Sequence, residues 1–337
     1  MKLPVLICDD SRLARRQMAR SLPQGWDVEL SFAENGAEAI DMIHQGRADL
    51  LFLDLNMPVM NGYEVLDLIR SDDLPTMVLV VSGDIQAEAR SRVMAKGALD
   101  FIQKPVSPDQ IRDVLLRYGI YENSGNPAPD NTATCRQTSQ RPDFQEALRE
   151  VVNVAMGQAG SHLSDLLETF IQLPVPEVFI CEYQHIDRHL AYADGRMLSA
   201  VSHGFSGNGV AGEGIVLLRP ENIRDLHKLV ASDLPTDGDS YAGVLTDLSE
   251  LLVGSCLKGI SKQLDLDFNH SYPAVLGHTQ ICADLLDCAD NQQSVLAVNI
   301  TYHLQQPEMD CHLLLIFTED SIPSLTARVE MISTENP

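Results

Sequence analysis

The sequence predicts an α/β protein in which a doubly wound parallel sheet of five strands precedes a second, pseudo-symmetric domain of the α/β or α+β class. Three observations lead to this prediction. Short apolar runs alternate with helical patterns as far as residue 118, a polar stretch follows, and a helical segment then recurs after 97 residues. The chain has 337 residues, more than the usual domain of about 100 to 200 residues. We therefore expect domains at 1–121 and 143–337, joined by a linker at 122–142.

The first domain is predicted from five apolar strands with helical segments between them. The strands are expected at Val5–Cys8, Val28–Phe32, Leu50–Leu55, Met77–Val81 and Asp100–Gln103, and helices at segments such as Ser11–Leu22 and Ala87–Ala95. A run such as Leu50-Leu51-Phe52-Leu53 has no polar face, which suits a strand buried on both sides. Five successive strand–helix units predict a parallel sheet with helices on both faces.

Charge and cysteine content limit the partners and the compartment. Residues 1–142 carry 15 Lys and Arg against 20 Asp and Glu, and residues 143–337 carry 9 against 28. Phosphate binding needs clustered basic residues, so nucleic acid and anionic membranes are disfavoured as partners. No apolar run approaches the roughly 18 to 20 residues of a membrane span. Seven cysteines without a Cys-x-x-Cys pair and the lack of a signal-peptide pattern lead us to expect a cytoplasmic protein.

Polar residues follow the predicted strands of the first domain. Asp9 and Asp10 come after the first strand, Asp54 closes the third, Ser82 closes the fourth, and Lys104 follows the fifth. Ligands of an open parallel sheet bind at the carboxyl ends of the strands, so these residues are expected to share one site. Three neighbouring carboxylates repel one another unless a hard cation lies between them, and Mg2+ takes oxygen ligands. The pattern predicts a metal site with a phosphoryl acceptor.

The order of these residues resembles the CheY-like receiver family over residues 3 to about 119. The resemblance rests on Asp9-Asp10-Ser11, Leu53-Asp54-Leu55-Asn56-Met57-Pro58, Gly62, Ser82 and Lys104-Pro105. It implies a flavodoxin-like fold and a response regulator of a two-component system, in which a sensor histidine kinase supplies the phosphoryl group. Pairing of two receivers into a homodimer is an assembly that the family also implies.

The resemblance implies a role for each matching residue. Asp54 would be the nucleophile that is phosphorylated. Mg2+ would be held by Asp10, Asp54 and the backbone carbonyl of Asn56, with Asp9 acting mainly through water.

Three further residues would respond to the phosphoryl group. Lys104 would neutralise one phosphate oxygen, and Ser82 would hydrogen-bond another. Phe101 would move inward as the switch residue.

The second domain contains an internal repeat. Residues 122–142, rich in Ser, Thr, Asn and Pro, form the expected linker before it. Helices are predicted at about 143–170 and 241–264, and strand-like stretches at 176–184, 196–218, 271–281 and 294–317. A constant offset of 97 relates Glu150 to Asp247, Asn153 to Glu250, Gly157 to Gly254 and Pro176 to Pro273. Two copies of one unit are therefore expected to build a pseudo-symmetric domain.

The first repeat helix carries Glu146, Glu150 and Asn153 on one face, because they are spaced by four and then three residues. We expect this face to be exposed. An amide can both accept from and donate to a water without adding negative charge, which suits hydrolysis of an acyl phosphate. The motif Glu146-x3-Glu150-x2-Asn153-x22-Pro176 resembles the CheC, CheX and FliY phosphatase family over about residues 143–333. That family inserts an acid and an amide into a phosphorylated receiver, so the catalytic pair here would be Glu150 and Asn153.

The second copy departs from this pattern. Gly243 stands in place of Glu146, and Glu250 stands in place of Asn153. A carboxylate at the amide position would repel phosphoryl oxygens and could not donate a hydrogen bond. We therefore expect one working site and one silent copy.

These features leave three hypotheses about function. The leading one is a chemotaxis-type response regulator, phosphorylated on Asp54, whose CheC-like domain dephosphorylates receiver phosphoaspartate in its own chain or in another CheY-like protein. The alternative is a phosphorylation-gated binding module, in which the face around Asn153 has no catalytic role. A DNA-binding regulator ranks third because the second domain is acidic and has no basic recognition helix.

Overall fold

The structure is a computed structural model that describes residues 2–121, 144–190, 192, 195–230, 240–286 and 293–334. Its internal contacts divide the chain into two compact units, one formed by Met1–Gly83 with Ala87–Glu150 and the other by Asp84–Gln86 with Val151–Glu335. The predicted linker at 122–142 lies outside the described residues, so the predicted domain boundaries stay a prediction. None of the helices in the described ranges combines the length and the apolar character that crossing a membrane requires.

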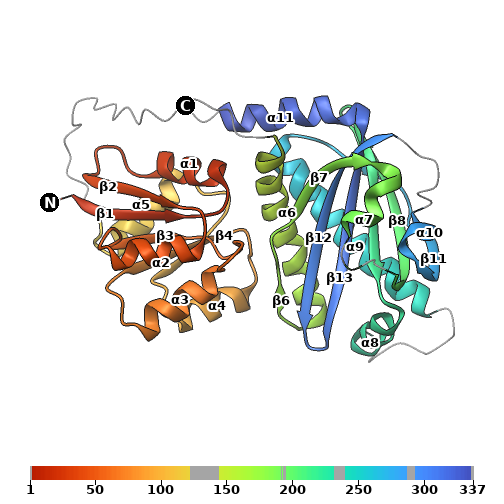
Figure 1. The fold of residues 1–337 in the computed structure, drawn as a ribbon, viewed down its shortest axis with the longest axis horizontal. Helices are drawn as coiled ribbons and strands as arrows, with labels where there is room; N and C mark the ends of the chain where they lie inside the picture. Colours follow the sequence, from red (N-terminus) through yellow and green to blue (C-terminus); the bar gives the residue numbers. More distant parts are fainter. Residues whose placement is uncertain are drawn as a thin grey trace. The chain divides into compact units, whose positions relative to one another are not determined.

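Strands and helices alternate along the first unit (Figure 1), as predicted. They are β1 (Leu3–Cys8), α1 (Arg12–Ser21), β2 (Val28–Ala33), α2 (Gly36–His44), β3 (Leu50–Leu53), α3 (Gly62–Ser71), β4 (Met77–Ser82), α4 (Ala87–Ala95), β5 (Asp100–Gln103) and α5 (Pro108–Arg117). The sheet order is β2-β1-β3-β4-β5, and every neighbouring pair is parallel. The predicted doubly wound sheet is confirmed.

Alternate residues of the central strands feed two separate cores. Leu6 and Leu51 belong to a cluster with buried side chains of α2 and α3. Ile7 and Phe52 belong to a second cluster with buried side chains of α1 and α5. Both faces of the sheet are therefore apolar, because successive side chains of a strand point to opposite faces. The central strands β1 and β3 are apolar within the sheet, so their polar neighbours Asp9, Asp10 and Asp54 follow the strand ends.

The second unit contains the same succession of elements twice. The first copy runs through α6 (Phe144–Leu167), β6 (Ile171–Gln172), β7 (Glu177–Glu182), α7 (Ile186–His189), β8 (Met197–Gly207), β9 (Val210–Leu218) and α8 (Pro220–Val230). The second runs through α9 (Ser240–Leu264), β10 (Asn269–His270), β11 (Ala274–Ile281), α10 (Cys282–Leu285), β12 (Ser294–Gln305), β13 (Glu308–Thr318) and α11 (Ile322–Thr334). Shifting α6 by 97 residues gives 241–264, within one residue of α9. The predicted internal repeat is confirmed.

The strands of the two copies form one antiparallel sheet with matching halves. Its order is β10-β8-β9-β13-β12-β6, with β11 also paired to β8 and β7 also paired to β12. The equivalent strands β9 and β13 lie at the centre and pair with each other, from His312 with Leu217 to Phe317 with Gly212. Ile215, Ile316 and Leu314 pack in a core with buried residues of α7 and α10. Strands of the two copies also pair further out in the sheet, because β10 and β11 of the second copy pair with β8, and β6 and β7 of the first copy pair with β12. The repeated halves are therefore interleaved, with the β9–β13 pair at the centre.

We expect His312 on β13 to make the stability of the second unit depend on pH. Its ring is buried, stacks on Tyr192 with centroids 3.5 Å apart, and has Nδ1 3.1 Å from Oγ1 of Thr301. Burial lowers the pKa of His312 to about 4. The unfolded chain, with an ordinary histidine pKa near 6.5, then binds a proton that the folded chain does not. Stability present above about pH 6.5 should be lost toward pH 4, by up to about 3 kcal/mol.

Urea unfolding of the wild type and His312→Gln at pH 7 and pH 4.5 checks this expectation. The variant should lose less stability between the two pH values than the wild type loses. His270→Gln, which changes an exposed histidine, should follow the wild type. Equal losses in all three proteins would contradict the role of His312.

Candidate functional site

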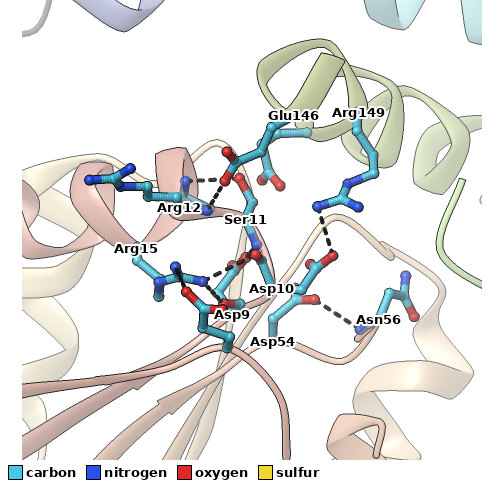
Figure 2. Close-up of polar contacts among 12 residues, drawn as sticks. Asp9, Asp10, Ser11, Arg12, Arg15, Asp54, Asn56, Glu146 and Arg149 are labelled. Atoms are coloured by element: carbon cyan, nitrogen blue, oxygen red, sulfur yellow. Dashed lines mark hydrogen bonds and ion pairs between the residues drawn. The ribbon is translucent and has the colours of Figure 1, made fainter. Parts of the chain in front are cut away.

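The predicted site residues meet at the carboxyl ends of the first unit's strands. Asp9 and Asp10 follow β1, Asp54 follows β3, Ser82 ends β4, and Lys104 follows β5. Figure 2 draws the side chains of Asp9, Asp10 and Asp54 close to one another. Asp9, Asp54, Ser82 and Lys104 are each at most 5% exposed. The sheet has thus gathered charged groups in a region with little water.

Lys104 lies at the centre of the charged cluster. Its Nζ donates a hydrogen bond to Oδ2 of Asp9 at 2.8 Å and lies 3.1 Å from Oδ1 of Asp54. It also lies 3.0 Å from Oε1 of Glu150, which belongs to the same unit. Burial alone would lower the pKa of Lys104, but the three carboxylates outweigh it and hold the pKa well above its usual value. Lys104 therefore stays a cation.

The loop after β1 is fixed by a network around Asp9. Oδ1 of Asp9 accepts a hydrogen bond from the backbone N–H of Ser11 at 2.9 Å, and Oγ of Ser11 caps α1 by accepting from the N–H of Ala14. Arg15 donates to the backbone carbonyl of Asp9 at 2.6 Å (Figure 2). It also pairs with Glu34 at 2.7 Å. Arg15 was not predicted as a site residue, because a helical arginine is usually solvated. Its buried guanidinium holds the loop in shape.

Asp54 is held by the turn that follows β3. Its Oδ2 accepts a hydrogen bond from the backbone N–H of Asn56 at 2.9 Å. Its Oδ1 accepts none from the described residues, although Lys104 lies nearby. Burial raises the pKa of Asp54 well above its usual value, and the charge of Lys104 opposes that rise. One carboxylate oxygen is therefore positioned by the backbone, and the other faces the charge of Lys104.

Two carboxylate oxygens of the site suit a hard cation. Oδ2 of Asp10 is buried and accepts no hydrogen bond from the described residues, and Oδ2 of Asp54, which accepts one from the N–H of Asn56, has a further lone pair for a metal. The part of the chain that the structure describes holds no ready-made group of three His, Cys, Asp or Glu ligands, since Asp9 is turned toward Lys104 and Ser11. Mg2+ is commonly bound through one or two carboxylates plus waters. Asp10 and Asp54 fit that requirement.

The first turns of α6 lie in the first unit and contact its charged site. Glu146 accepts a hydrogen bond from the backbone N–H of Arg12. Nη2 of Arg149 lies 3.3 Å from Oδ2 of Asp10 (Figure 2). Burial, followed by the charge of Asp9, raises the pKa of Asp10 to about 6, and Arg149 opposes that rise. Arg149 was not singled out from the sequence.

The expectation that Glu150 and Asn153 lie on an exposed face is wrong. Glu150 is 8% exposed and Asn153 is 5% exposed. Glu150 is buried because it pairs with Lys104, and burial raises the pKa of Glu150 to about 7 despite that pairing. Oδ1 of Asn153 is buried and accepts no hydrogen bond from the described residues. In the second copy, Glu250 is exposed.

The proposed switch residues occupy neighbouring strands. Ser82 is fully buried at the end of β4, where it pairs in register with Gln103 of β5. Phe101 on β5 is partly buried and packs against the core that includes α2 and α3. Their roles in switching stay predictions.

Comparison with known proteins places the first unit in a family. The family model "Response regulator receiver domain" matches residues 5–116. "Response regulator MprA" of Mycobacterium ulcerans is 37% identical over 175 residues, which cover 50% of this chain and 72% of that protein. The chain belongs to the response regulator receiver family. The receiver domain accounts for β1 to α5 and for the polar residues at the strand ends.

Two other proteins are similar to this chain over part of its length. A "Protein-glutamate methylesterase/protein-glutamine glutaminase" of Geobacillus kaustophilus is 32% identical over 180 residues, covering 51% of this chain and 52% of that protein. The chain thus spans about half the length of this curated relative. Among solved structures, Thermotoga maritima FliY aligns with 58% of this chain and 100% of its own, at 17% identity and a TM-score of 0.44.

Proposed function

We propose that this response regulator is phosphorylated on Asp54 in the presence of Mg2+ and that its second unit hydrolyses receiver phosphoaspartate. The observation that carries the proposal is the ion pair between Glu150 and Lys104 at 3.0 Å. It joins an acid of the phosphatase-like motif to the lysine of a receiver site. Asn153 lies one turn further along the same helix face.

The surroundings of Asp54 support its role as the phosphoryl acceptor. Its Oδ1 would attack the phosphorus of a phosphohistidine on a sensor kinase, and the bond from phosphorus to the histidine nitrogen would break as the new bond forms. Lys104, 3.1 Å from that oxygen, would neutralise charge on the phosphoryl group. Mg2+, when bound by Asp10, Asp54 and the carbonyl of Asn56, would neutralise further phosphoryl charge. Ser82 would hydrogen-bond a phosphoryl oxygen, and Phe101 would move inward.

Hydrolysis would reverse the modification without a new covalent intermediate. Asn153 would hold a water in line with the bond between phosphorus and Asp54, because its amide can accept from and donate to that water. The water oxygen would bond to phosphorus, the Asp54 carboxylate would leave, and the water proton would pass to phosphate or solvent. Glu150 would keep the helix on the site through Lys104.

A chase experiment with the full chain tests the proposed function. The chain is labelled with radioactive acetyl phosphate, freed of excess reagent, and followed for loss of label with and without added Asp54→Asn chain, which cannot itself be labelled. Loss at a rate independent of concentration would indicate hydrolysis within one chain, and acceleration by the added chain would indicate hydrolysis between chains. If Asn153→Ala chain loses label as fast as wild type in both formats, the enzyme proposal fails and a phosphorylation-gated binding module is favoured.

Glu250→Ala should leave the rate of label loss within about threefold of wild type. Glu250 is exposed, and its carboxylate cannot donate the hydrogen bond that the proposed water requires. The measurement is the same chase, run beside Asn153→Ala as the matched change in the other copy. A loss of rate as deep as that in Asn153→Ala would mean that the second copy is active.

A further inference from the structure

Arg149 approaches a carboxylate that the proposed chemistry assigns to the metal. Its Nη2 lies 3.3 Å from Oδ2 of Asp10, and the Asp10 side chain is 8% exposed. That oxygen accepts no hydrogen bond from the described residues, although it is buried. Figure 2 shows the guanidinium pointing down from α6 to this carboxylate. The helix therefore brings a cation to an oxygen suited to Mg2+.

The net formal charge of the site favours the binding of a divalent cation. Four carboxylates surround Lys104 and Arg149, namely those of Asp9, Asp10, Asp54 and Glu150. With all six groups ionised, the cluster has a formal charge of −2. Mg2+ would balance this charge, but it would have to approach an oxygen that already faces Arg149.

A guanidinium and Mg2+ are poor neighbours on one carboxylate oxygen. Mg2+ requires near-ideal octahedral geometry at about 2.0 to 2.1 Å and keeps several of its waters. Like charges repel strongly in a buried site because solvent screens them little. The Arg149 side chain is 32% exposed, so it has a route to solvent when a stronger cation arrives.

We propose that Arg149 competes with Mg2+ for Asp10 and so acts as a positioning residue that lowers the metal affinity of the receiver while the start of α6 contacts its site. Binding of Mg2+ breaks the Arg149–Asp10 pair and leaves Glu150 and Lys104 as the remaining ion pair. Metal loading thereby weakens one of the contacts that α6 makes. The proposal rests on the Mg2+ site of the proposed function but does not depend on hydrolysis.

Mg2+ titration of the unphosphorylated full chain by calorimetry tests the competition. Arg149→Ala should bind Mg2+ on the order of tenfold more tightly than wild type, because one nearby positive charge is removed. Arg149→Lys keeps the charge and should stay closer to wild type than to Arg149→Ala. Arg112→Ala is the matched control: it removes one positive charge from an exposed pair with Asp109 and should change affinity by less than about twofold.

The outcomes separate this proposal from the proposed function. Unchanged or weaker Mg2+ binding in Arg149→Ala, with wild type binding normally, would overturn the competition alone. Absence of Mg2+ binding in every variant would overturn the metal site and with it the proposed phosphorylation chemistry. A tenfold gain shared by Arg112→Ala would show a general charge effect and would also overturn the competition.

Discussion

Replacing Asp54 with asparagine should abolish labelling of the chain by acetyl phosphate and Mg2+. Oδ1 of Asp54 accepts no hydrogen bond from the described residues and lies 3.1 Å from Lys104, so it is the carboxylate oxygen best placed to attack phosphorus. An amide is not nucleophilic enough to replace it. Burial raises the pKa of Asp54 because it disfavours the charged carboxylate. A neutral amide avoids this cost, so we expect the variant to fold.

Mass spectrometry of the intact chain and of its peptides measures this result. Wild type should gain one phosphoryl group on the peptide that contains Asp54, and Asp54→Asn should gain none. Asp109→Asn, which changes an exposed aspartate on α5, should label as wild type does. Undiminished labelling of Asp54→Asn at another residue would refute the assignment of the phosphoacceptor.

Asn153→Ala should slow enzymatic loss of the phosphoryl group by about a hundredfold. A rate loss of that size corresponds to about 2.7 kcal/mol of barrier height, within what the alignment of a nucleophilic water can supply. Asn153 is buried, but its Oδ1 accepts no hydrogen bond from the described residues. Truncating the amide therefore removes a group suited to catalysis without breaking a hydrogen bond that this oxygen makes within the fold.

Glu150→Ala is the informative companion of Asn153→Ala. It removes the partner of Lys104 at 3.0 Å, so it should weaken contact with the receiver site as well as turnover. Decay rates measured against the concentration of added chain separate the two effects, with circular dichroism as the folding control. Decay of Asn153→Ala at the wild-type rate would remove the catalytic hypothesis.

The receiver could be predicted in detail because its signals are local. Unbroken apolar runs specify strands buried on both sides, and the polar residues after them specify the site. The predicted third strand extended to Leu55, whereas β3 ends at Leu53. The chain turns there because the carboxylate of Asp54 accepts a hydrogen bond from the N–H of Asn56.

The second unit was predicted more coarsely. The stretch predicted at 196–218 divides into β8 and β9 around Asn208 and Gly209, which have positive φ angles of 51° and 78°. Such angles suit a tight hairpin, which fits the Gly-Asn-Gly sequence at this point. The fixed offset of 97 residues was more informative than periodicity, because it identified α6 and α9 as equivalent helices of two copies.

The contacts of α6 could not be predicted from periodicity. Arg149 and its partner Asp10 are 139 residues apart, and helical spacing shows only which residues share a face. Arginine and glutamate on a helix are usually exposed to solvent, so the residue type alone does not indicate that either has a buried partner. The partner of Glu150 is likewise distant in sequence, since Lys104 follows β5.

The pairing of β9 with β13 constrains buried positions of both copies more than it constrains their exposed positions. The two strands come from different copies, and Ile215 and Leu314 are fully buried there. Replacing either side chain with a smaller one would open a cavity between the two copies. A change at Glu250 would open no such cavity, since Glu250 is exposed. After a duplication, the second copy can therefore stay necessary for the fold through its strands, while exposed positions on its helix accept substitutions.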